Sequence, residues 1–385
     1  WLKPMWLDLD APSGAGEGRA PAMQRTYLLT VCFGVSSWVT INGIFSVLPL
    51  IINRLPEGWA IASTLGLAVQ AANVGPLAYR LSRRSFEAIA PVVYGILALG
   101  VLSMLLLACF WHVTMQVAGA SCSAALIFFT FTAAVCDCTS SVVFWPFVGA
   151  FAPAMVSGLA LGENLSGVVA AAVSWLGLSP SGSFCALAGV LLLSGGAFWG
   201  LQREACSAGA KEYAAASQAF VAGRSLSPML PYLVVGLTSL FENAVLPSVL
   251  PYATARYSQT NYHLASTVPV GPLSLLTLVY FQASRTAVAA MSVAATLAVG
   301  LIILVGLGGA DIGGGATLAV VMVAKVLLVY CKATSMYHLK VGAAKREEAQ
   351  GHLETAGCMM QIWSLTGAVA MFVLTHCTAV FPRRH

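Results

Sequence analysis

Five ionisable side chains lie inside long apolar stretches of this chain of 385 residues. They are three acids and two bases: Asp137, Glu163, Glu242, Lys325 and Lys332. At the centre of a membrane helix each would cost about 2.5–3.5 kcal/mol, so such groups normally face a bundle interior or an aqueous cavity. Their charges sum to −1, so pairing would neutralise most of the set and leave one carboxyl group able to exchange a proton. We therefore treat Asp137, Glu163, Glu242 and Lys325 as candidates for proton coupling or ion pairing.

Structural alternatives stay open for these residues. Asp137 heads the run Asp137–Ser141, in which Ser140 and Ser141 return to its helix face at i+3 and i+4, and this favours a functional role. For Glu242, a structural ion pair is as compatible with the sequence as a functional role is. Lys332 lies nearer a helix end, where its ammonium group can reach the interface.

Uncharged polar residues form further clusters within the apolar stretches. Trp38 and Asn42 are spaced i, i+4, and Gln70 and Asn73 are spaced i, i+3. Amide and hydroxyl groups beside aromatic rings suit a planar, neutral heterocycle, which stacks on its faces and hydrogen-bonds at its edges. Hydrogen bonds between helices are the alternative. We expect a substrate site that includes Trp38, Thr40, Asn42, Gln70, Asn73, Ser141, Asn164, Asn243, Tyr262 and Lys332.

Several classes of function are not indicated. The sequence has no phosphate-binding glycine loop, no H-E-x-x-H motif and no G-x-S-x-G in a strand-to-helix context, so we do not expect an enzyme. It has no arginine-rich pocket for a phosphate, no acidic ring for a metal and no long basic run for nucleic acid. We expect neither a cofactor nor a bound metal.

The composition explains what must position these residues. The hydrophobic share is 58% and the charged share 9%, against about 45–50% and about 25% in soluble domains. The excess apolar surface must face lipid. The 36 glycines suit closely packed membrane helices. The sequence thus predicts an all-α integral membrane protein that is built to move a small polar solute.

Eleven stretches are long and apolar enough to cross a bilayer, which takes about 20 residues. They are residues 26–53, 61–80, 87–111, 121–146, 152–176, 183–201, 229–255, 262–282, 286–307, 316–338 and 356–380. Residues 1–25, rich in Gly, Pro and Ala, are expected to form a disordered tail, with Met23 as an alternative start, and 381–385 a short C-terminal tail.

The positive charges predict an orientation. With the N-terminus in the cytoplasm, the inner segments hold 13 Lys or Arg residues and the outer segments four, as the positive-inside rule requires. The C-terminus is then extracellular. The longest connection, 202–228, is a cytoplasmic linker between a first bundle of six helices, 26–201, and a second of five, 229–380. This layout is typical of carriers that rock about a central site.

Several blocks resemble the riboflavin transporter family of animals, a solute carrier group with eleven spans. The similarity is densest in Ser37–Gly43, Leu55–Trp59 and Gln70–Pro76. It returns in Asp137–Val142, in Gly162–Glu163 with Leu165–Gly167, in Asn243 with Leu246–Val249, and in Tyr262–Ala265. Two positions depart from the family pattern: Val47 stands where an acid is usual, and Glu242 where we expect an uncharged residue.

The resemblance implies riboflavin as substrate, imported by alternating access through the plasma membrane. It also implies a fold like that of major-facilitator or equilibrative-nucleoside-type carriers. Two alternatives remain open: a carrier of nucleosides or another planar neutral heterocycle, and a membrane receptor that binds a flavin without transporting it. The oligomeric state is not predicted.

Overall fold

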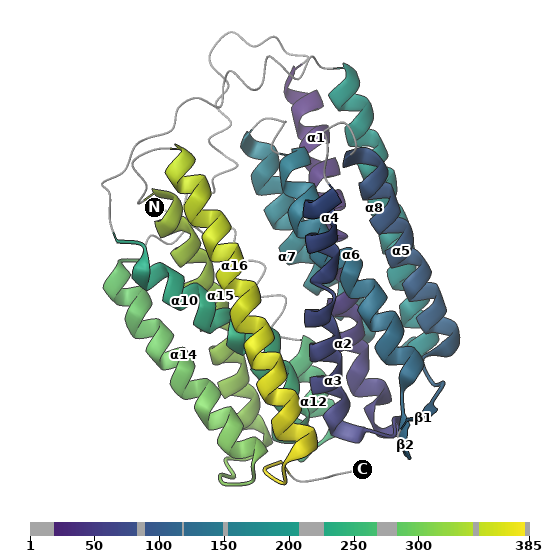
Figure 1. The fold of residues 1–385 in the computed structure, drawn as a ribbon, viewed down its shortest axis with the longest axis vertical. Coiled ribbons are helices and arrows are strands. Elements are labelled where there is room, and N and C mark those ends of the chain that lie inside the picture. The colour runs from purple at the N-terminus through teal and green to yellow at the C-terminus, as the bar shows by residue number, and fades with distance from the viewer. Residues whose placement is uncertain are drawn as a thin grey trace.

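The protein is a helical membrane protein whose helices fall into two sets that are consecutive in the chain (Figure 1). A computed structural model describes residues 19–82, 89–117, 119–148, 153–207, 227–267, 283–341 and 346–381. Most of the helices run along the long axis of the molecule, as expected if that axis crosses the bilayer.

The first set is formed by the N-terminal half of the chain. Helix α1 packs on α7 and α8, α5 packs on α6 and α8, and α2 packs on α7. Short 3-10 turns at Ile52–Arg54 (η2) and Gly58–Ala60 (η3) join α2 to α3. The helices are α1 Arg19–Val35, α2 Val39–Ile51, α3 Ile61–Ala71, α4 Val74–Ser82, α5 Ile89–Phe110, α6 Ala124–Val148, α7 Pro153–Trp175 and α8 Pro180–Ser207.

The second set contains three π-helical turns, which are uncommon and frequent at functional sites. Helix α10 packs on α15 and α16, and α14 packs on α15. The elements are α10 Met229–Leu240, η5 Phe241–Val245 (π), α11 Leu246–Leu250, η6 Pro251–Ala255 (π), α12 Gln259–Thr267, α14 Arg285–Gly306, α15 Gly314–Val341, α16 Arg346–Phe372 and η7 Val373–Cys377 (π).

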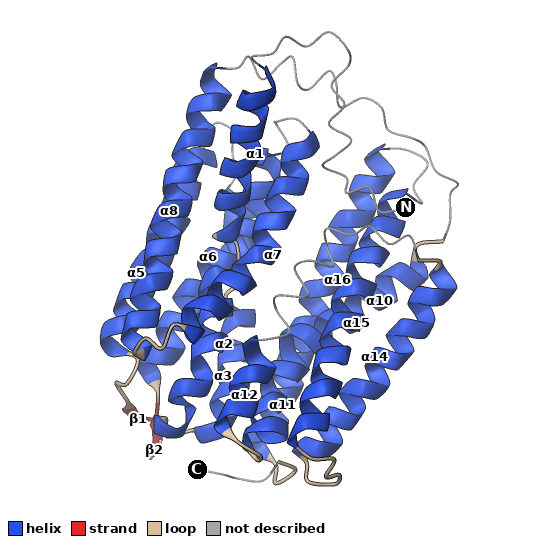
Figure 2. Ribbon diagram, turned by 180° about the vertical axis from the view of Figure 1, so that it is seen from behind, coloured by secondary structure: helices blue, strands red, loops and turns tan. Residues whose placement is uncertain are grey.

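The two sets approach each other at one end of the molecule. There α3 packs on α16 and α11, and α2 and α7 pack on α12. Figure 2 shows the helices of the two sets converging towards this end, where α2, α3, α11 and α12 lie, and diverging towards the other. We call the first of these the convergent end.

Eight helices of the described residues are long and apolar enough to span a membrane, and a ninth candidate is a bent pair, Met23–Val35 with Val39–Arg54. Helix α7 is not among the eight. Of the predicted span 262–282, residues 268–282 lie outside the described residues. The structure therefore supports a multi-span helical protein, while the count of eleven stays a prediction.

Several helices extend beyond the predicted spans. Helix α1 begins at Arg19, so residues 19–25 are helical, contrary to the predicted disordered tail. Helix α8 continues to Ser207, and α16 begins at Arg346, inside a segment predicted to be a connection. An apolar stretch in the sequence marks only the part of a helix that lies in lipid. It does not reveal polar turns that continue the helix beyond the bilayer. Of the predicted tail 381–385 only Phe381 is described.

A small β-hairpin between α5 and α6 was not predicted. Strand β1 (Met115–Val117) pairs antiparallel with β2 (Ala120–Cys122), which occupies the start of the predicted span 121–146. Gly119 in the turn has φ +83°, a conformation that glycine adopts without strain. The Glu57 carboxylate accepts from Ser123 N and Ser123 Oγ, each at 2.6 Å, and ties the hairpin to the η2–η3 loop.

Helices α1 and α7 touch through two glycines. A Cβ on Gly34 would lie 2.6 Å from Leu159 O, and one on Gly162 would lie 2.2 Å from Val31 O. Real Cβ atoms do not approach backbone so closely, so any larger residue would push the helices apart. This contact places the start of α2 beside the Glu163 turn of α7.

We therefore expect Gly162→Ala to destabilise the protein by about 1–3 kcal/mol, the usual penalty for overpacking. Thermal unfolding in detergent, followed by size-exclusion chromatography with fluorescence detection, measures the change. Gly189→Ala on α8 is a matched control, because a Cβ there meets nothing within 4 Å. If both variants unfold at the wild-type temperature, the close contact between α1 and α7 is wrong.

Candidate functional site

The first predicted span is broken at Ser36–Trp38, and the chain bends by 50° between α1 and α2. Backbone groups freed by such a break need partners inside the protein, because lipid provides none. Helix α6 supplies two of them. Asp137 Oδ2 accepts from Ile41 N at 3.0 Å, and Ser140 Oγ donates to Ser37 O at 3.2 Å.

Asp137 therefore acts on the N-terminal turn of α2 in the way that an N-cap side chain acts on its own helix. Its side chain is fully buried, and a carboxylate is favourable at the positive end of a helix dipole. Trp38, at the N-cap position of α2, makes no capping hydrogen bond of its own. Thr40 Oγ1 donates to Ala133 O of α6 at 3.4 Å.

A polar cluster lies on α7 next to this break. Asn42 Nδ2 donates to Ser166 Oγ at 3.0 Å, which joins α2 to α7. Trp145 Nε1 donates to Glu163 Oε1 at 3.1 Å, which joins α6 to α7. Asn164 is bonded within its own helix, to Ala160 O at 2.8 Å. Three helices of the first set thus contribute polar groups to one region.

The second set contributes the charged residues of its π-helical turn η5. Glu242 forms a direct ion pair with Lys332 of α15, and their side chains are 27% and 28% exposed. Both side chains are therefore only partly buried. The neighbouring Asn243 Nδ2 donates to Ser364 Oγ of α16 at 3.0 Å.

Lys325 joins two helices of the second set. Its Nζ donates to Ala265 O of α12 at 3.1 Å, and it lies within electrostatic range of Glu242. Lys332 interacts electrostatically with Glu163 across the boundary between the sets. These four residues are two acids and two bases, so their formal charges sum to zero. Asp137, the carboxyl group left over in the charge count, lies instead at the α2 N-terminus.

The remaining predicted site residues have different surroundings. Gln70 and Asn73 bond each other: Asn73 Nδ2 donates to Gln70 O at 3.1 Å and to its Oε1 at 3.3 Å. Tyr262 is buried among apolar residues, with 2% of its surface exposed, which is the environment of a packing residue. Trp38 and Ser141 are partly buried.

Sequence reasoning missed the partners of these residues: Trp145, Ser166 and Ser364. Trp145 had a usable signal, because it lies on the Asp137 face of α6, eight residues later. Ser166 lay in the family-like block at Glu163 but was not predicted as a site residue. Ser364 had no signal, since serine is common in membrane helices and costs little there.

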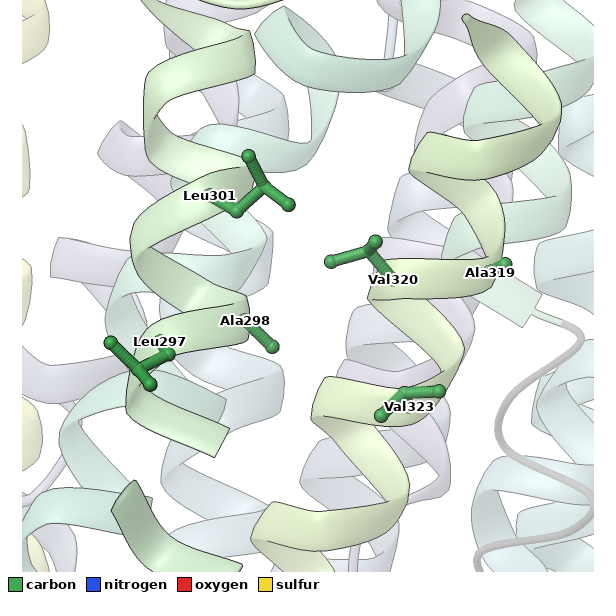
Figure 3. A pocket seen from close by; sticks show the side chains of 6 residues that line it. All are labelled: Leu297, Ala298, Leu301, Ala319, Val320 and Val323. Atoms are coloured by element: carbon green, nitrogen blue, oxygen red, sulfur yellow. The ribbon is translucent and has the colours of Figure 1, made fainter. Parts of the chain in front are cut away.

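The pocket shown in Figure 3 is a different kind of site. It lies between α14 and α15 and is lined only by aliphatic side chains, Leu297, Ala298, Leu301, Ala319, Val320 and Val323. Leu297 is 70% exposed and Val323 54%, as expected for residues that face lipid. Such a surface offers no hydrogen bond to a polar solute, so we place the candidate site at the polar cluster.

Comparison with known proteins identifies related sequences over nearly the whole chain. The chain is 27% identical to solute carrier family 52, riboflavin transporter, member 3-B of Danio rerio, covering 92% of this chain and 97% of that protein. It is 29% identical to member 2 of Sus scrofa, covering 95% and 98%.

Solved structures with the same fold are transporters of low sequence identity. A POT family peptide transporter matches with a TM-score of 0.60 at 13% identity, covering 92% of this chain and 89% of that chain. The xylose transporter XylE from E. coli matches with a TM-score of 0.56 at 11% identity, covering 92% of each. The likeness supports the fold of this transporter class.

The sequence model described as "Solute carrier family 52, riboflavin transporter" matches residues 23–181 and 202–383. This match includes the break between α1 and α2, the Glu163 turn and the Glu242–Lys332 pair. The chain belongs to solute carrier family 52, the riboflavin transporters.

Proposed function

We propose that this protein imports riboflavin across the plasma membrane by alternating access. The observation that carries the proposal is the neutral cluster of polar and charged groups, contributed by both sets of helices, in the interior of a riboflavin transporter family member. The fold of the solved relatives supports a carrier rather than an enzyme.

In this proposal the chain forms eleven spans in two bundles, 26–201 and 229–380, joined by a cytoplasmic linker at 202–228. The N-terminus is cytoplasmic and the C-terminus extracellular. Arg25, Arg203 and Arg285 then lie on the cytoplasmic side, and Arg54 and Arg256 outside, which agrees with the positive-inside rule. The convergent end of the helices faces outward, so the described conformation is open towards the cytoplasm.

Riboflavin has chemistry that suits the cluster. Its isoalloxazine ring is planar and neutral, so it can stack on Trp38, while its edge and ribityl hydroxyls can bond Asn42, Ser141, Asn164 and Asn243. The Glu242–Lys332 pair supplies charge-assisted hydrogen bonds without adding net charge. Thr40 and Tyr262 are buried in this conformation, so we propose that they support the site from behind. Gln70 and Asn73 require a movement to reach substrate.

Reconstitution into proteoliposomes tests the whole proposal. We expect labelled riboflavin to enter by counterflow when the vesicles are loaded with unlabelled riboflavin, and excess lumiflavin to block this uptake. Uptake abolished by excess nucleoside but not by lumiflavin would favour a carrier of another heterocycle. Binding of riboflavin without counterflow would favour a receptor.

The ion pair gives a sharper prediction for the site. Glu242→Gln leaves the Lys332 ammonium group without its partner in a weakly hydrated interior, which costs several kcal/mol. We expect counterflow to fall about tenfold or more, and the exchange of the two residues, Glu242→Lys with Lys332→Glu, to restore part of it. Arg25→Gln removes the Arg25–Glu204 pair, in which Arg25 is 73% exposed, and should change little. Equal losses in Glu242→Gln and Arg25→Gln would contradict this assignment.

Two substitutions of Asp137 distinguish a role of this residue in capping α2 from a role in proton coupling. In Asp137→Asn the amide oxygen still accepts from Ile41 N, so we expect counterflow within about threefold of wild type. Asp137→Ala removes the acceptor, and loss of a cap typically costs about 0.5–2 kcal/mol of stability, so uptake and thermal stability should fall together. If Asp137→Asn instead removes a dependence of uptake on external pH, Asp137 titrates during transport. Uptake that ignores pH, or survives neutralising both Asp137 and Glu163, rules out proton coupling through these acids.

A further inference from the structure

Two hydrogen-bonded contacts at the convergent end join the helix sets through histidines that have no assigned role. The first joins α7 to α12. His263 Nε2 lies 3.1 Å from Ser174 Oγ, and the His263 ring stacks on Trp175 with centroids 4.3 Å apart and planes 19° apart. Trp175 Nε1 also donates to Thr267 Oγ1 at 2.8 Å. Since Ser174 Oγ donates to Ala171 O on its own helix, the hydroxyl oxygen accepts from His263.

The second contact joins α3 to the π-helical turn η7. His376 Nε2 lies 3.1 Å from Thr64 Oγ1, and Thr375 Oγ1 lies 2.6 Å from Ser63 Oγ. The His376 ring stacks on Phe372 of the preceding turn, with centroids 4.4 Å apart. The wider π turn thus presents two consecutive residues to α3, and π turns recur at functional positions.

The two contacts flank weaker ones at the same end of the molecule. The Trp59 and Tyr252 rings meet edge to face, with centroids 5.7 Å apart. Asn53 Nδ2 donates to Gln259 Oε1 at 3.2 Å in an exposed position. All of these join residues of the first set to residues of the second, where the two sets converge (Figure 2).

The chemistry of the two histidine contacts suits repeated opening. Their hydrogen bonds join hydroxyl, indole and imidazole groups, so none of them pairs a cation with a carboxylate. Separating such groups leaves no unpaired ion, whereas breaking the Glu242–Lys332 pair would. Each hydrogen bond of this kind changes the equilibrium between the closed and open conformations only a few-fold. The contacts can therefore favour the closed conformation and still allow it to open.

We propose that the His263–Ser174/Trp175 and His376–Thr64 contacts are the two latches of the extracellular gate, closed in the inward-open state and released in the outward-open state that admits riboflavin from outside. The proposal rests on the alternating access proposed above. It makes His263 and His376 gating residues, which set the populations of the two states without contacting substrate.

Distance measurement between spin labels tests the latches directly. Labels at Arg54→Cys and Thr260→Cys, both exposed residues of opposite sets, report the separation at the convergent end. The background replaces by serine the exposed or partly exposed cysteines of the described residues, and Cys206 as well. They are Cys32, Cys109, Cys122, Cys185, Cys358 and Cys377. We expect the His263→Ala/His376→Ala double variant to raise the population with the longer distance about fivefold or more. His112→Ala, an exposed histidine at the same end, is the matched control and should change nothing.

A disulfide that keeps the gate closed is a second test, whereas the double variant should open the gate. It does not depend on a destabilised variant. Ser63→Cys with Thr375→Cys replaces two hydroxyls whose oxygens are in hydrogen-bond contact at 2.6 Å, so the two thiols can meet. Oxidation should lock the latch and reduce riboflavin counterflow about tenfold or more, and a reducing agent should restore it. Counterflow at the wild-type rate while mass spectrometry shows the disulfide formed would overturn the proposal.

The two readouts separate failure of the gate from failure of the proposed function. A double variant that stays monodisperse and keeps the short distance overturns the latches, even if wild-type vesicles transport riboflavin. Wild-type vesicles that show no counterflow overturn the proposed function, while the label distances still decide whether the two histidines hold this end closed.

Discussion

The interruption of the first span is the constraint on which the rest of the site depends. In lipid, a broken helix survives only if neighbouring protein groups satisfy the backbone that the break frees. Here α6 meets that need with the Asp137 carboxylate and the Ser140 hydroxyl. The Gly34–Gly162 contact allows α7 to approach closely enough for Asn42 to bond Ser166. The direction of α2, and with it the position of Trp38, follows from these contacts.

Apart from Asp137, the five ionisable residues singled out from the apolar stretches comprise equal numbers of acids and bases. With Asp137 hydrogen-bonded at a helix N-terminus, the formal charges of the other two acids and two bases sum to zero. The Glu242–Lys332 pair lies within one set, and Lys332 also interacts with Glu163 of the other set. Lys332 therefore interacts with acids of both sets, directly with Glu242 and at longer range with Glu163.

Prediction from the sequence worked best for residues that cost free energy when they are inserted into lipid. Apolar length and the positive charges were enough for a many-span helical protein, and the intramembrane acids and lysines stood out because their insertion is costly. The polar ends of α8 and α16 were missed because water outside the bilayer places no such demand. The role of Asp137 as a cap was also hidden, since a sequence shows that a carboxylate is buried but not which backbone group it meets. Ser166 and His263 lay in blocks that resemble the family, but their partners were not predicted, and Ser364 and His376 gave no signal, because hydroxyls and imidazoles join helices at little cost and without a fixed spacing.

The polar groups at the convergent end differ from those in the middle of the molecule, and the difference has a physical reason. A gate must break and re-form in every cycle, so its contacts need to be individually weak, and hydroxyl–imidazole bonds supported by ring stacking meet that requirement. The centre must distinguish a hydroxylated, planar solute from water, so it needs groups that lose much when left unpaired, which charged and amide side chains do. Placing ions in the gate would make each opening costly, and placing only hydroxyls in the centre would lower selectivity. The arrangement with ions in the middle and neutral latches at the end avoids both.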